Sequence, residues 1–299
     1  MAPRNFIAAA RFYSLTRQAG AISNAGTWML DDPFGGGVAP CRLPMSGLLS
    51  PIRPGFVVAI PVRDEEERLP ACLRALAQQR NRLGQSIPPT LVRIVLFANN
   101  CTDQSADLAR KLGRRLSLDV RVVEARLPLS SAHAGAARRE VMDLAEEWLQ
   151  KGGESDGVIL TTDADSQVDP DWLVHQLRLG ADMVLGVVRI DDWRHHSADF
   201  ADRYVQAYDA DGEAAGRHAH VHGANMGFSA GAYWRVGGFR PLPSGEDVDL
   251  VARFEAAGYC IHRDAELSVT TSARSQARAP HGFAHHLTQL EGSVAEGCA

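Results

Sequence analysis

Cysteines are few in this sequence, and none of them has the spacing of a paired or metal-binding site. The chain of 299 residues has five cysteines, which are scattered and never form a Cys-x-x-Cys unit. That spacing argues against a zinc ribbon and against a framework of disulfides. Since free thiols persist best in a reducing compartment, we expect a cytoplasmic protein.

Long apolar runs and an excess of positive charge are missing as well. No segment approaches the roughly 20 apolar residues that cross a bilayer, and the N-terminus lacks the apolar core of a secretory signal. Asp and Glu (36 residues) outnumber Lys and Arg (31), and the formal net charge is −5. We therefore expect neither a transmembrane segment nor a nucleic-acid partner, and contact with a membrane surface stays open.

The first 50 residues differ in pattern from the rest of the chain. The glycines from Gly35 to Gly37 and several prolines interrupt a weak apolar pattern, which is typical of a loose extension. The extension is either disordered or not translated, because Met45 offers a start shortly before the first convincing strand. Residues 51–270 suffice for one α/β domain with a sizeable core. Residues 271–299 form a separate C-terminal segment.

From residue 55 onward, apolar runs alternate with amphipathic stretches. The run from Phe56 to Ile60 indicates a parallel strand buried on both faces, with Pro61 at its end and Pro70 at the first position of a helix. Further strands are expected at 92–97, 120–123, 157–160 and 183–188, and helices at 106–112 (ended by Gly113), 135–150 and 247–257. This order predicts a Rossmann-like α/β fold, a single domain with a mostly parallel central sheet flanked by helices.

Three polar loops, at residues 63–68, 98–103 and 163–165, follow strands at their carboxyl ends. Open α/β sheets bind their ligands outside these ends. We therefore expect the three loops to converge on one crevice.

The third loop contains Asp163-Ala164-Asp165, directly after a buried strand. Two carboxylates separated by one small residue can reach one hard cation, and oxygen ligands of this kind suit Mg²⁺ or Mn²⁺ beside substrate phosphates. Such an ion would neutralise a diphosphate leaving group. A solvated acidic turn is the alternative, because Asp-x-Asp is common, and the place after a buried strand favours the metal site.

A second acidic pair, Glu246-Asp247, stands at the start of a predicted helix. Carboxylates at this place stabilise the helix through its dipole. The same place would hold a general base rigidly, ready to take a proton from a hydroxyl group. Both interpretations can be true together.

The C-terminal segment concentrates basic side chains. They are Arg274, Arg278, His281, His285 and His286. The segment could close over a diphosphate as a flap, with His281 completing the metal shell, or it is a basic surface tail. His222, just before Gly223, is a weaker ligand candidate.

Five segments occur in an order that resembles the family 2 glycosyltransferases, which have the nucleotide-binding GT-A fold. They are FVVAIPVRDEEERL (56–69), NNCTD (99–103), DAD (163–165), GANMGF (223–228) and GGFRPLPSGEDVD (237–249). No one segment is specific, whereas their order is, and together they cover about residues 55–265. The resemblance implies metal-dependent, inverting transfer of a sugar from a nucleotide-diphospho-sugar donor to an acceptor hydroxyl.

The resemblance also implies a role for each matched residue. Asp165 would bind the metal with Asp163 beside it, and Asp247 would be the catalytic base, with Glu246 next to it. The implied donor-binding residues are Pro61, Arg63, Glu65, Glu66, Asn99, Asp103, Arg138, Asp163, Ala164, Gly223, Ala224 and Asn225. The polar stretch 191–222 is expected to meet the acceptor, although it has no readable pattern of its own.

One position departs from the family pattern. The second strand of the family often ends in a carboxylate that contacts the nucleotide base, whereas Ala98-Asn99 stands here. An asparagine can offer its oxygen or its amide hydrogens. UDP is therefore not fixed as the donor nucleotide, and GDP, dTDP or another nucleotide stays open.

Other functions fit the sequence less well. A sugar-nucleotide pyrophosphorylase would have a basic, Gly-rich loop after the first strand, whereas residues 64–67 are acidic and contain no glycine. A Rossmann dehydrogenase would have Gly-x-Gly-x-x-Gly there. A non-catalytic nucleotide-binding scaffold would leave Asp163, Asp165 and Asp247 idle. The pyrophosphorylase and the scaffold remain the alternatives to a glycosyltransferase.

Overall fold

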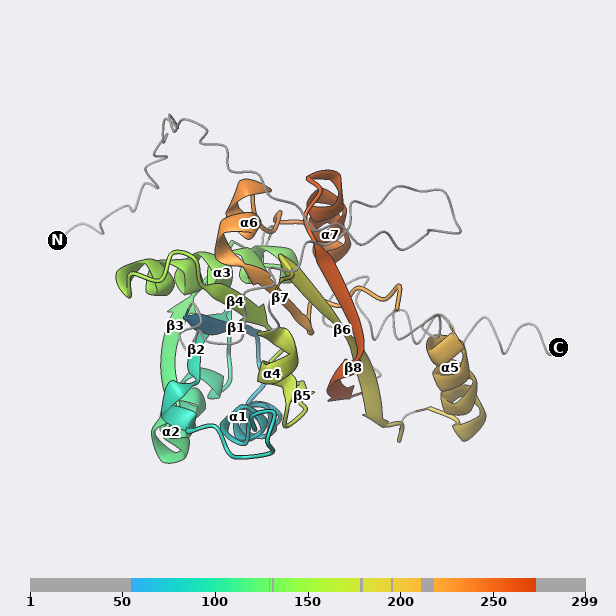
Figure 1. Cartoon of the computed structure of the whole chain (residues 1–299). Coiled ribbons are helices and arrows are strands. Elements are labelled where there is room, and N and C mark those ends of the chain that lie inside the picture. The colour runs from blue at the N-terminus through green and yellow to red at the C-terminus, as the bar shows by residue number, and fades with distance from the viewer. Residues whose placement is uncertain are drawn as a thin grey trace. The chain divides into compact units, whose positions relative to one another are not determined.

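The computed structural model describes residues 55–128, 130, 132–177, 180–194, 196–210 and 218–272 (Figure 1). These residues all belong to the unit Pro40–Ala299, and only that unit is described. The N-terminal extension and the basic C-terminal side chains, His281 among them, lie outside the described residues. The expectations about these segments therefore stay predictions.

One mixed sheet carries the described part of the chain. Its strands are β1 (Phe56–Val62), β2 (Arg93–Asn99), β3 (Asp119–Ala125), β4 (Val158–Thr161), β5 (Gln167–Val168), β6 (Met183–Asp192), β7 (Met226–Ser229) and β8 (Ile261–Ser272). They lie in the order β3-β2-β1-β4-β7-β6-β8-β5. Strands β3, β2, β1 and β4 are parallel, β7 is antiparallel to β4 and β6, β8 is parallel to β6, and β5 is antiparallel to β8.

Helices cover both faces of this sheet (Figure 1). They are α1 (Leu69–Ala77), α2 (Ser105–Leu116), α3 (Ala134–Lys151), α4 (Trp172–Gln176), α5 (Ala198–Ala210), α6 (Ala230–Arg235) and α7 (Glu246–Ala256), with a 3₁₀ turn η1 (Pro89–Leu91). The α/β fold with a mostly parallel sheet flanked by helices is confirmed. No helix among the described residues is both long and apolar enough to cross a membrane.

The central strands supply two cores because successive side chains point to opposite faces. Val58 and Ile60 of β1 pack with α1, α2 and α4, whereas Val57 and Ala59 pack with α3, α6 and α7. All four side chains are fully buried. The continuous apolar run of β1 thus reflects a strand covered on both sides, as its composition predicts.

Pro61 and Gly113 were expected to end a strand and a helix, and neither does so. Strand β1 continues through Pro61 to Val62, because its pairing with β4 ends at Ala59 and the later residues pair only with β2. A proline is tolerated where one side of the strand needs no N–H. Helix α2 likewise passes through Gly113, whose missing Cβ would lie 2.9 Å from Val120. The glycine allows close packing of α2 on β3, so its interpretation as a helix end was wrong.

Candidate functional site

Two of the three polar loops, those after β1 and β4, lie near the buried thiol of Cys72 on α1. Its Sγ lies 3.6 Å from the carbonyl oxygen of Asp163. Burial raises the pKa of this thiol, and the nearby carboxylates of Asp165, Asp163 and Glu65 raise it further. Glu65 of the loop after β1 and Asp163 of the loop after β4 thus both lie near α1. The crevice expected at the carboxyl ends of the strands stays a prediction.

The loops after β1 and β2 are joined by hydrogen bonds. Asp64, at φ 51°, accepts through Oδ1 from Thr102 N (2.6 Å), Thr102 Oγ1 (3.1 Å) and Asp103 N (3.2 Å). The N–H of Glu65 donates to Ser105 Oγ at 2.8 Å. The N–H of Glu66 donates to Asp103 Oδ2 at 2.9 Å. These bonds fix the backbone of the first loop against the second.

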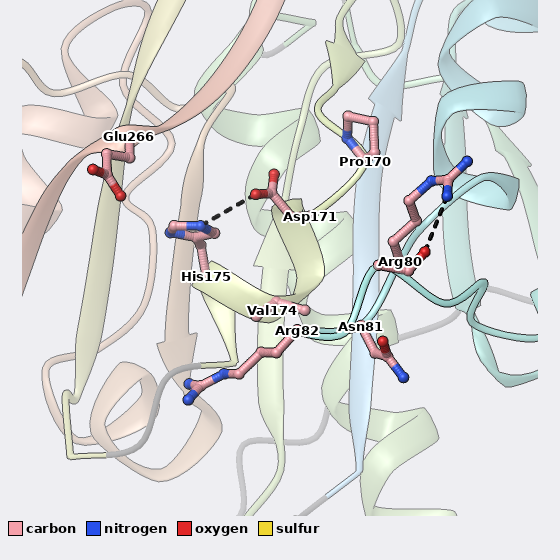
Figure 2. Close-up of a pocket in the computed structure, with 9 residues that line it drawn as sticks. Arg80, Asn81, Arg82, Pro170, Asp171, Val174, His175 and Glu266 are labelled. Atoms are coloured by element: carbon pink, nitrogen blue, oxygen red, sulfur yellow. Dashed lines mark hydrogen bonds and ion pairs between the residues drawn. The ribbon is translucent and has the colours of Figure 1, made fainter.

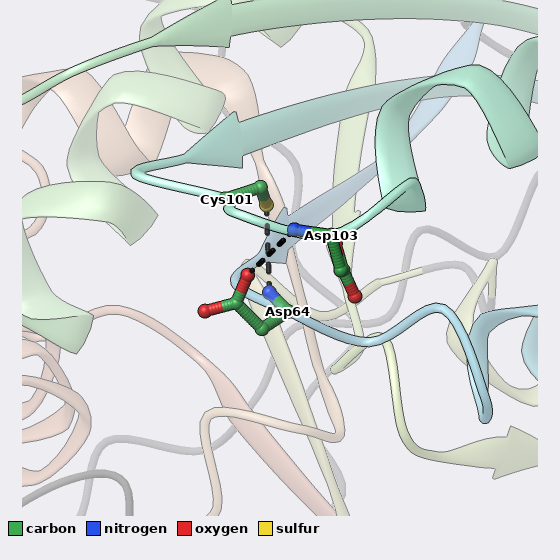
Figure 3. A group of neighbouring side chains, drawn as sticks. All are labelled: Asp64, Cys101 and Asp103. Atoms are coloured by element: carbon green, nitrogen blue, oxygen red, sulfur yellow. Dashed lines mark hydrogen bonds between the residues drawn. The ribbon is translucent and has the colours of Figure 1, made fainter.

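Asp64, Cys101 and Asp103 form a compact group at this junction (Figure 3). One ligand atom from each lies within 4.8 Å of the others. The sulfur of Cys101 accepts the N–H of Asp64 at 3.4 Å and lies 3.6 Å from the carbonyl of Val62, and burial raises the pKa of this thiol. A neutral thiol is a poor metal ligand. These contacts instead hold the loop after β2 against the end of β1 and the loop that follows it.

Asn99 ends β2 with a buried and unsatisfied oxygen. The residue is 2% exposed, and its Oδ1 has no hydrogen-bond partner in the described part of the chain. A buried acceptor without a donor costs about 1–3 kcal/mol. This acceptor lies at the position where the sequence predicts contact with the nucleotide base.

Arg138 on α3 ties the site together from within. The residue is 5% exposed. Its Nη2 donates to Asp163 Oδ1 at 3.0 Å, and Nη1 donates to Gly223 O at 2.7 Å and Thr161 Oγ1 at 3.1 Å. Its Nε donates to Glu246 Oε1 at 3.4 Å. One guanidinium therefore links α3, the end of β4, the segment before β7 and the start of α7.

The charge of Arg138 is secured by its neighbours. Burial alone would lower the pKa of Arg138, but the carboxylates of Asp163, Glu246 and Asp247 raise it well above its ordinary value. The guanidinium therefore stays protonated. Removing one partner of a buried ion pair costs about 3–5 kcal/mol, so this residue supports the fold as well as the site.

A glycine lets the start of α7 reach Arg138. A Cβ on Gly135 would lie 2.4 Å from the carbonyl oxygen of Leu242. Only glycine allows the loop before α7 to approach the start of α3 so closely. This approach brings Glu246 onto Arg138, although the two residues are 108 positions apart.

The two acidic residues at the start of α7 differ in accessibility. Glu246 is 6% exposed and bonds to Arg138. Asp247 is only half-buried, and each of its oxygens accepts a backbone N–H, from Gly223 to Oδ2 and from Val248 to Oδ1, both at 2.9 Å. Of the pair, Asp247 is the carboxylate that a ligand can reach, and it is held in a fixed orientation.

The side chain of Asn225 links a helix to two strands of the sheet. Its Oδ1 accepts from Trp172 Nε1 (2.9 Å) and Gln176 Nε2 (3.0 Å), and its Nδ2 donates to Val187 O (2.9 Å) and Leu267 O (3.0 Å). The side chain is fully buried. All four of these bonds go to protein groups, so the amide acts as a joint between α4, β6 and β8.

Other predicted donor-binding residues occupy varied places. The side chain of Ala164 is buried in the core, and Ala224 packs against the same core. Pro61 lies within β1. Arg63 is exposed, and its Nη1 donates to Ala132 O at 2.9 Å, so it fastens the segment that leads into α3. The structure thus brings the carboxylates and Arg138 together, whereas these smaller residues shape the backbone around them.

The sequence analysis missed three residues that hold the site in place. Cys72, Ser105 and Thr161 contact Asp163, Glu65 and Arg138 respectively. Their side chains are small, and nothing in the sequence around them marks a site. No spacing marks them, because their roles arise from packing between elements that are far apart in the chain.

A cavity of about 670 Å³ lies elsewhere, between the segment after α1, the start of α4 and β8 (Figure 2). Arg80, Arg82, Asp171, His175 and Glu266 contribute to its lining, and none of the predicted site residues does. Opposite charges share its wall, and the ring of His175 lies 3.5 Å from the Asp171 carboxylate. The cavity is therefore not part of the predicted site.

The sequence as a whole matches a known family. The model of the family described as Glycosyltransferase like family 2 matches residues 54–283. The chain belongs to this family. The match covers the site residues from Pro61 to Asp247, as the resemblance predicts. No curated protein matches the chain.

Solved structures agree with the fold. The chain is similar to the mannosyltransferase PcManGT from Pyrobaculum calidifontis in complex with GDP-Man and Mn²⁺, with TM-score 0.55 and 17% identity over 82% of this chain and 65% of that chain. Lower similarity is found to S. aureus TarS 1–349 (TM-score 0.49, 14% identity, 79% of this chain and 69% of that chain). Lower similarity is also found to glucosyl-3-phosphoglycerate synthase from Mycobacterium tuberculosis (TM-score 0.44, 15% identity, 82% of this chain and 79% of that chain). The chain thus spans 65% of the mannosyltransferase, and this likeness shows a GT-A-like fold.

Proposed function

We propose that this family 2 glycosyltransferase moves a sugar from a nucleotide-diphospho-sugar to an acceptor hydroxyl, with inversion and with help from a divalent metal ion. One observation carries the proposal. The carboxylate of Asp247 and the carboxylate of Asp163 are joined through Gly223 and Arg138 by bonds of 2.7–3.0 Å. A reachable base and an acidic metal loop thus form one connected unit.

The acidic residues near α1 support a cation. The carboxylates of Glu65, Asp163 and Asp165 all raise the pKa of the buried Cys72 thiol, and Asp163 is paired with Arg138. Asp163 and Asp165 offer hard oxygen atoms, which suit Mg²⁺ or Mn²⁺. When bound there, the ion would supply positive charge against the diphosphate that leaves. Arg138 would add a fixed charge behind Asp163 and keep its second oxygen directed outward.

Asp247 is proposed as the base of a single displacement. The acceptor hydroxyl would pass its proton to Asp247 while its oxygen forms a bond to the anomeric carbon. The bond from that carbon to the diphosphate would break on the opposite side, and the nucleoside diphosphate would leave with the electron pair. Attack opposite to the leaving group inverts the configuration. Two backbone N–H groups hold the carboxylate for this proton transfer.

Asn99 is proposed to read the nucleotide base. Its buried Oδ1 needs a donor, and both uracil and guanine offer a ring N–H. The mannosyltransferase with the same fold is in complex with GDP-Man and Mn²⁺. UDP and GDP sugars are therefore the first donors to test, and dTDP sugars follow because thymine has the same ring N–H as uracil.

The substitution Asp247→Asn tests the proposal. We expect it to lower transfer by at least about 100-fold while the affinity for the nucleotide sugar is unchanged. Asp249→Asn is the matched control, because Asp249 lies one position beyond Val248 on α7 and pairs with Arg240 and Arg253. Transfer at the normal rate in the Asp247 variant, or loss of its donor affinity, would overturn the role of Asp247. Absence of transfer in the wild-type protein with UDP, GDP and dTDP sugars would favour the scaffold.

A further inference from the structure

Tyr208 on α5 bonds to the residue before Gly223. Its hydroxyl oxygen lies 2.8 Å from His222 Nε2 and accepts the N–H of Val188 at 3.0 Å. No other hydrogen bond of this hydroxyl occurs among the described residues. A hydroxyl group has one hydrogen and two lone pairs, so it can donate to Nε2 of a neutral His222 while it accepts from Val188. The contact fixes the imidazole of His222 against α5.

Three imidazoles form a stack beside this tyrosine. The rings of His218, His220 and His222 follow one another with centroids 5.8 and 5.9 Å apart. The ring of His220 lies flat on Tyr208, 3.7 Å between centroids and 2° from parallel. Arg263 donates to three backbone oxygens of the same segment, those of residues 218–220. The segment before Gly223 is thus fixed from α5 on one side and from β8 on the other.

We propose that Tyr208 is a positioning residue for Asp247, acting through His222 and the peptide of Gly223. The N–H of Gly223 holds Asp247 Oδ2 at 2.9 Å, and the carbonyl of Gly223 holds Arg138 at 2.7 Å. His222 is the direct neighbour of this glycine, so a displaced His222 ring moves the peptide that orients the base. The inference rests on the proposed function in taking Asp247 as the base.

Protonation of His222 would break this arrangement. If Nε2 carried a hydrogen, the hydroxyl oxygen of Tyr208 would accept from both Val188 and His222. The hydroxyl hydrogen of Tyr208 would then lose Nε2 as its acceptor. Burial and the neighbouring His220 and His218 lower the pKa of His222 to about 4. Among the described residues, the other titratable or charged groups around the segment and its tyrosine include Tyr204 and Asp209 on α5, Arg189 on β6, Arg263 on β8, Asp247 on α7 and Arg138 on α3.

The variant Tyr208→Phe tests whether Tyr208 positions Asp247 or only contributes to the stability of the fold. It keeps the ring against His220 and removes the hydroxyl. Tyr233→Phe is the matched control, because the hydroxyl of Tyr233 also accepts a backbone N–H, from Phe239 at 2.8 Å, and is buried. Both variants leave one backbone N–H without its acceptor, so both should lose similar stability, of which thermal melts are the measure. Only the Tyr208 variant should disturb Gly223.

The decisive measurement is a pH titration of the full chain by NMR, which observes the Gly223 amide and the His222 ring without any substrate. In the wild type and in Tyr233→Phe, we expect neither signal to show a midpoint between about pH 5.5 and about pH 8. In Tyr208→Phe, both should titrate together at a higher pH than in the wild type, because the hydroxyl donor to Nε2 is lost, whereas burial and the neighbouring His220 and His218 still lower the pKa of His222. In the double variant with His222→Gln, the Gly223 midpoint should disappear.

Each other outcome overturns the inference. A Gly223 amide that does not titrate in Tyr208→Phe shows that the tyrosine does not act on it. A wild-type His222 that titrates near 6.5 shows that the hydroxyl does not hold it neutral. A Gly223 midpoint that persists in the double variant assigns the effect to another group.

A kinetic readout keeps this inference apart from the proposed function. With UDP-glucose or GDP-mannose and Mn²⁺, release of nucleoside diphosphate by Tyr208→Phe should fall about tenfold in kcat below the midpoint, while the donor KM stays as in the wild type. If Asp247→Asn keeps its activity but Gly223 responds as expected, the base assignment fails and the coupling stands. If Asp247 is essential and Gly223 does not respond, only the coupling fails.

Discussion

The backbone N–H of Gly223 donates to Oδ2 of Asp247 at 2.9 Å, across 24 positions of sequence. The other end of the same glycine, its carbonyl, accepts from Arg138. A single glycine residue, through its two flanking peptide groups, therefore joins the reachable carboxylate of α7 to the buried arginine beside Asp163.

Gly223 should not tolerate a side chain. A Cβ there would lie 2.7 Å from Nη2 and 2.8 Å from Cζ of Arg138. Because the guanidinium is buried and held by four hydrogen bonds, we expect Gly223→Ala to cost about 1–3 kcal/mol of unfolding free energy and to lower transfer further. Gly231→Ala on α6 is the control, since its Cβ has open space with the nearest atom at 4.0 Å. Urea unfolding is the measurement, and equal stability of the two variants would contradict the tight contact at Gly223.

Arg138→Met should destabilise the protein strongly. The change leaves Glu246 buried and Asp163 without its partner, so we expect a loss of about 3–5 kcal/mol in urea unfolding. Arg138→Lys should recover only part, because one ammonium cannot span Thr161, Gly223 and two carboxylates. The exposed pair of Arg110 with Glu124 provides the control, and Arg110→Met should cost under about 1 kcal/mol. Comparable losses in the two methionine variants would argue against the central place of Arg138.

Asp143 on α3 should reduce stability at neutral pH. Burial raises the pKa of Asp143 to about 6 from 3.8, and its Oδ1 has no hydrogen-bond partner in the described part of the chain. The folded state therefore binds a proton more tightly than the unfolded chain does. The penalty is complete above pH 6, shrinks as the pH falls, and disappears below about 3.8.

Asp143→Asn should accordingly stabilise the protein at pH 8 by about 1 kcal/mol, an amount reduced by solvent screening of a partly exposed group. The gain should vanish near pH 4, where wild-type Asp143 is protonated. Thermal melts of this variant and of Asp156→Asn, an exposed control, provide the comparison. A gain that is independent of pH would show that charge is not its cause.

Sequence patterns were most informative where one strand is buried on both faces. The apolar runs at β1, β2 and β4, and the stripes of α1, α3 and α7, predicted these elements within a few residues. Single prolines and glycines gave wrong predictions of where an element ends, as Pro61 and Gly113 show. Their effect depends on which strand or helix packs beside them. Strands β5 and β8 and helix α6 were not expected, and α5 lies in a stretch without a readable pattern. In that half of the sheet, antiparallel pairing replaces the strand–helix rhythm.

The site shows the same limit. The carboxylates could be found in the sequence because they follow a strand or begin a helix, where a ligand would bind. Their connection could not be found, because Arg138 reaches Glu246 across 108 positions only through the close approach that Gly135 allows. Cys260 is disulfide-bonded, whereas Cys72 and Cys101 are free, and no spacing in the sequence distinguishes them. The cytoplasmic location and the C-terminal flap with His281 stay predictions.

The central claim is that the Asp163–Asp165 loop holds a divalent ion and the diphosphate of a nucleotide. Thermal melts with UDP, GDP, dTDP and CMP, each with and without Mn²⁺, test it most directly, since a ligand at 100 times its Kd stabilises the fold by about 2.7 kcal/mol. We predict that one nucleoside diphosphate with Mn²⁺ raises Tm more than either component alone. Asp165→Ala should lose the Mn²⁺-dependent part of this rise, whereas Asp156→Ala keeps it. A wild-type Tm that no combination changes, or an Asp165→Ala variant that responds like the wild type, would contradict the account.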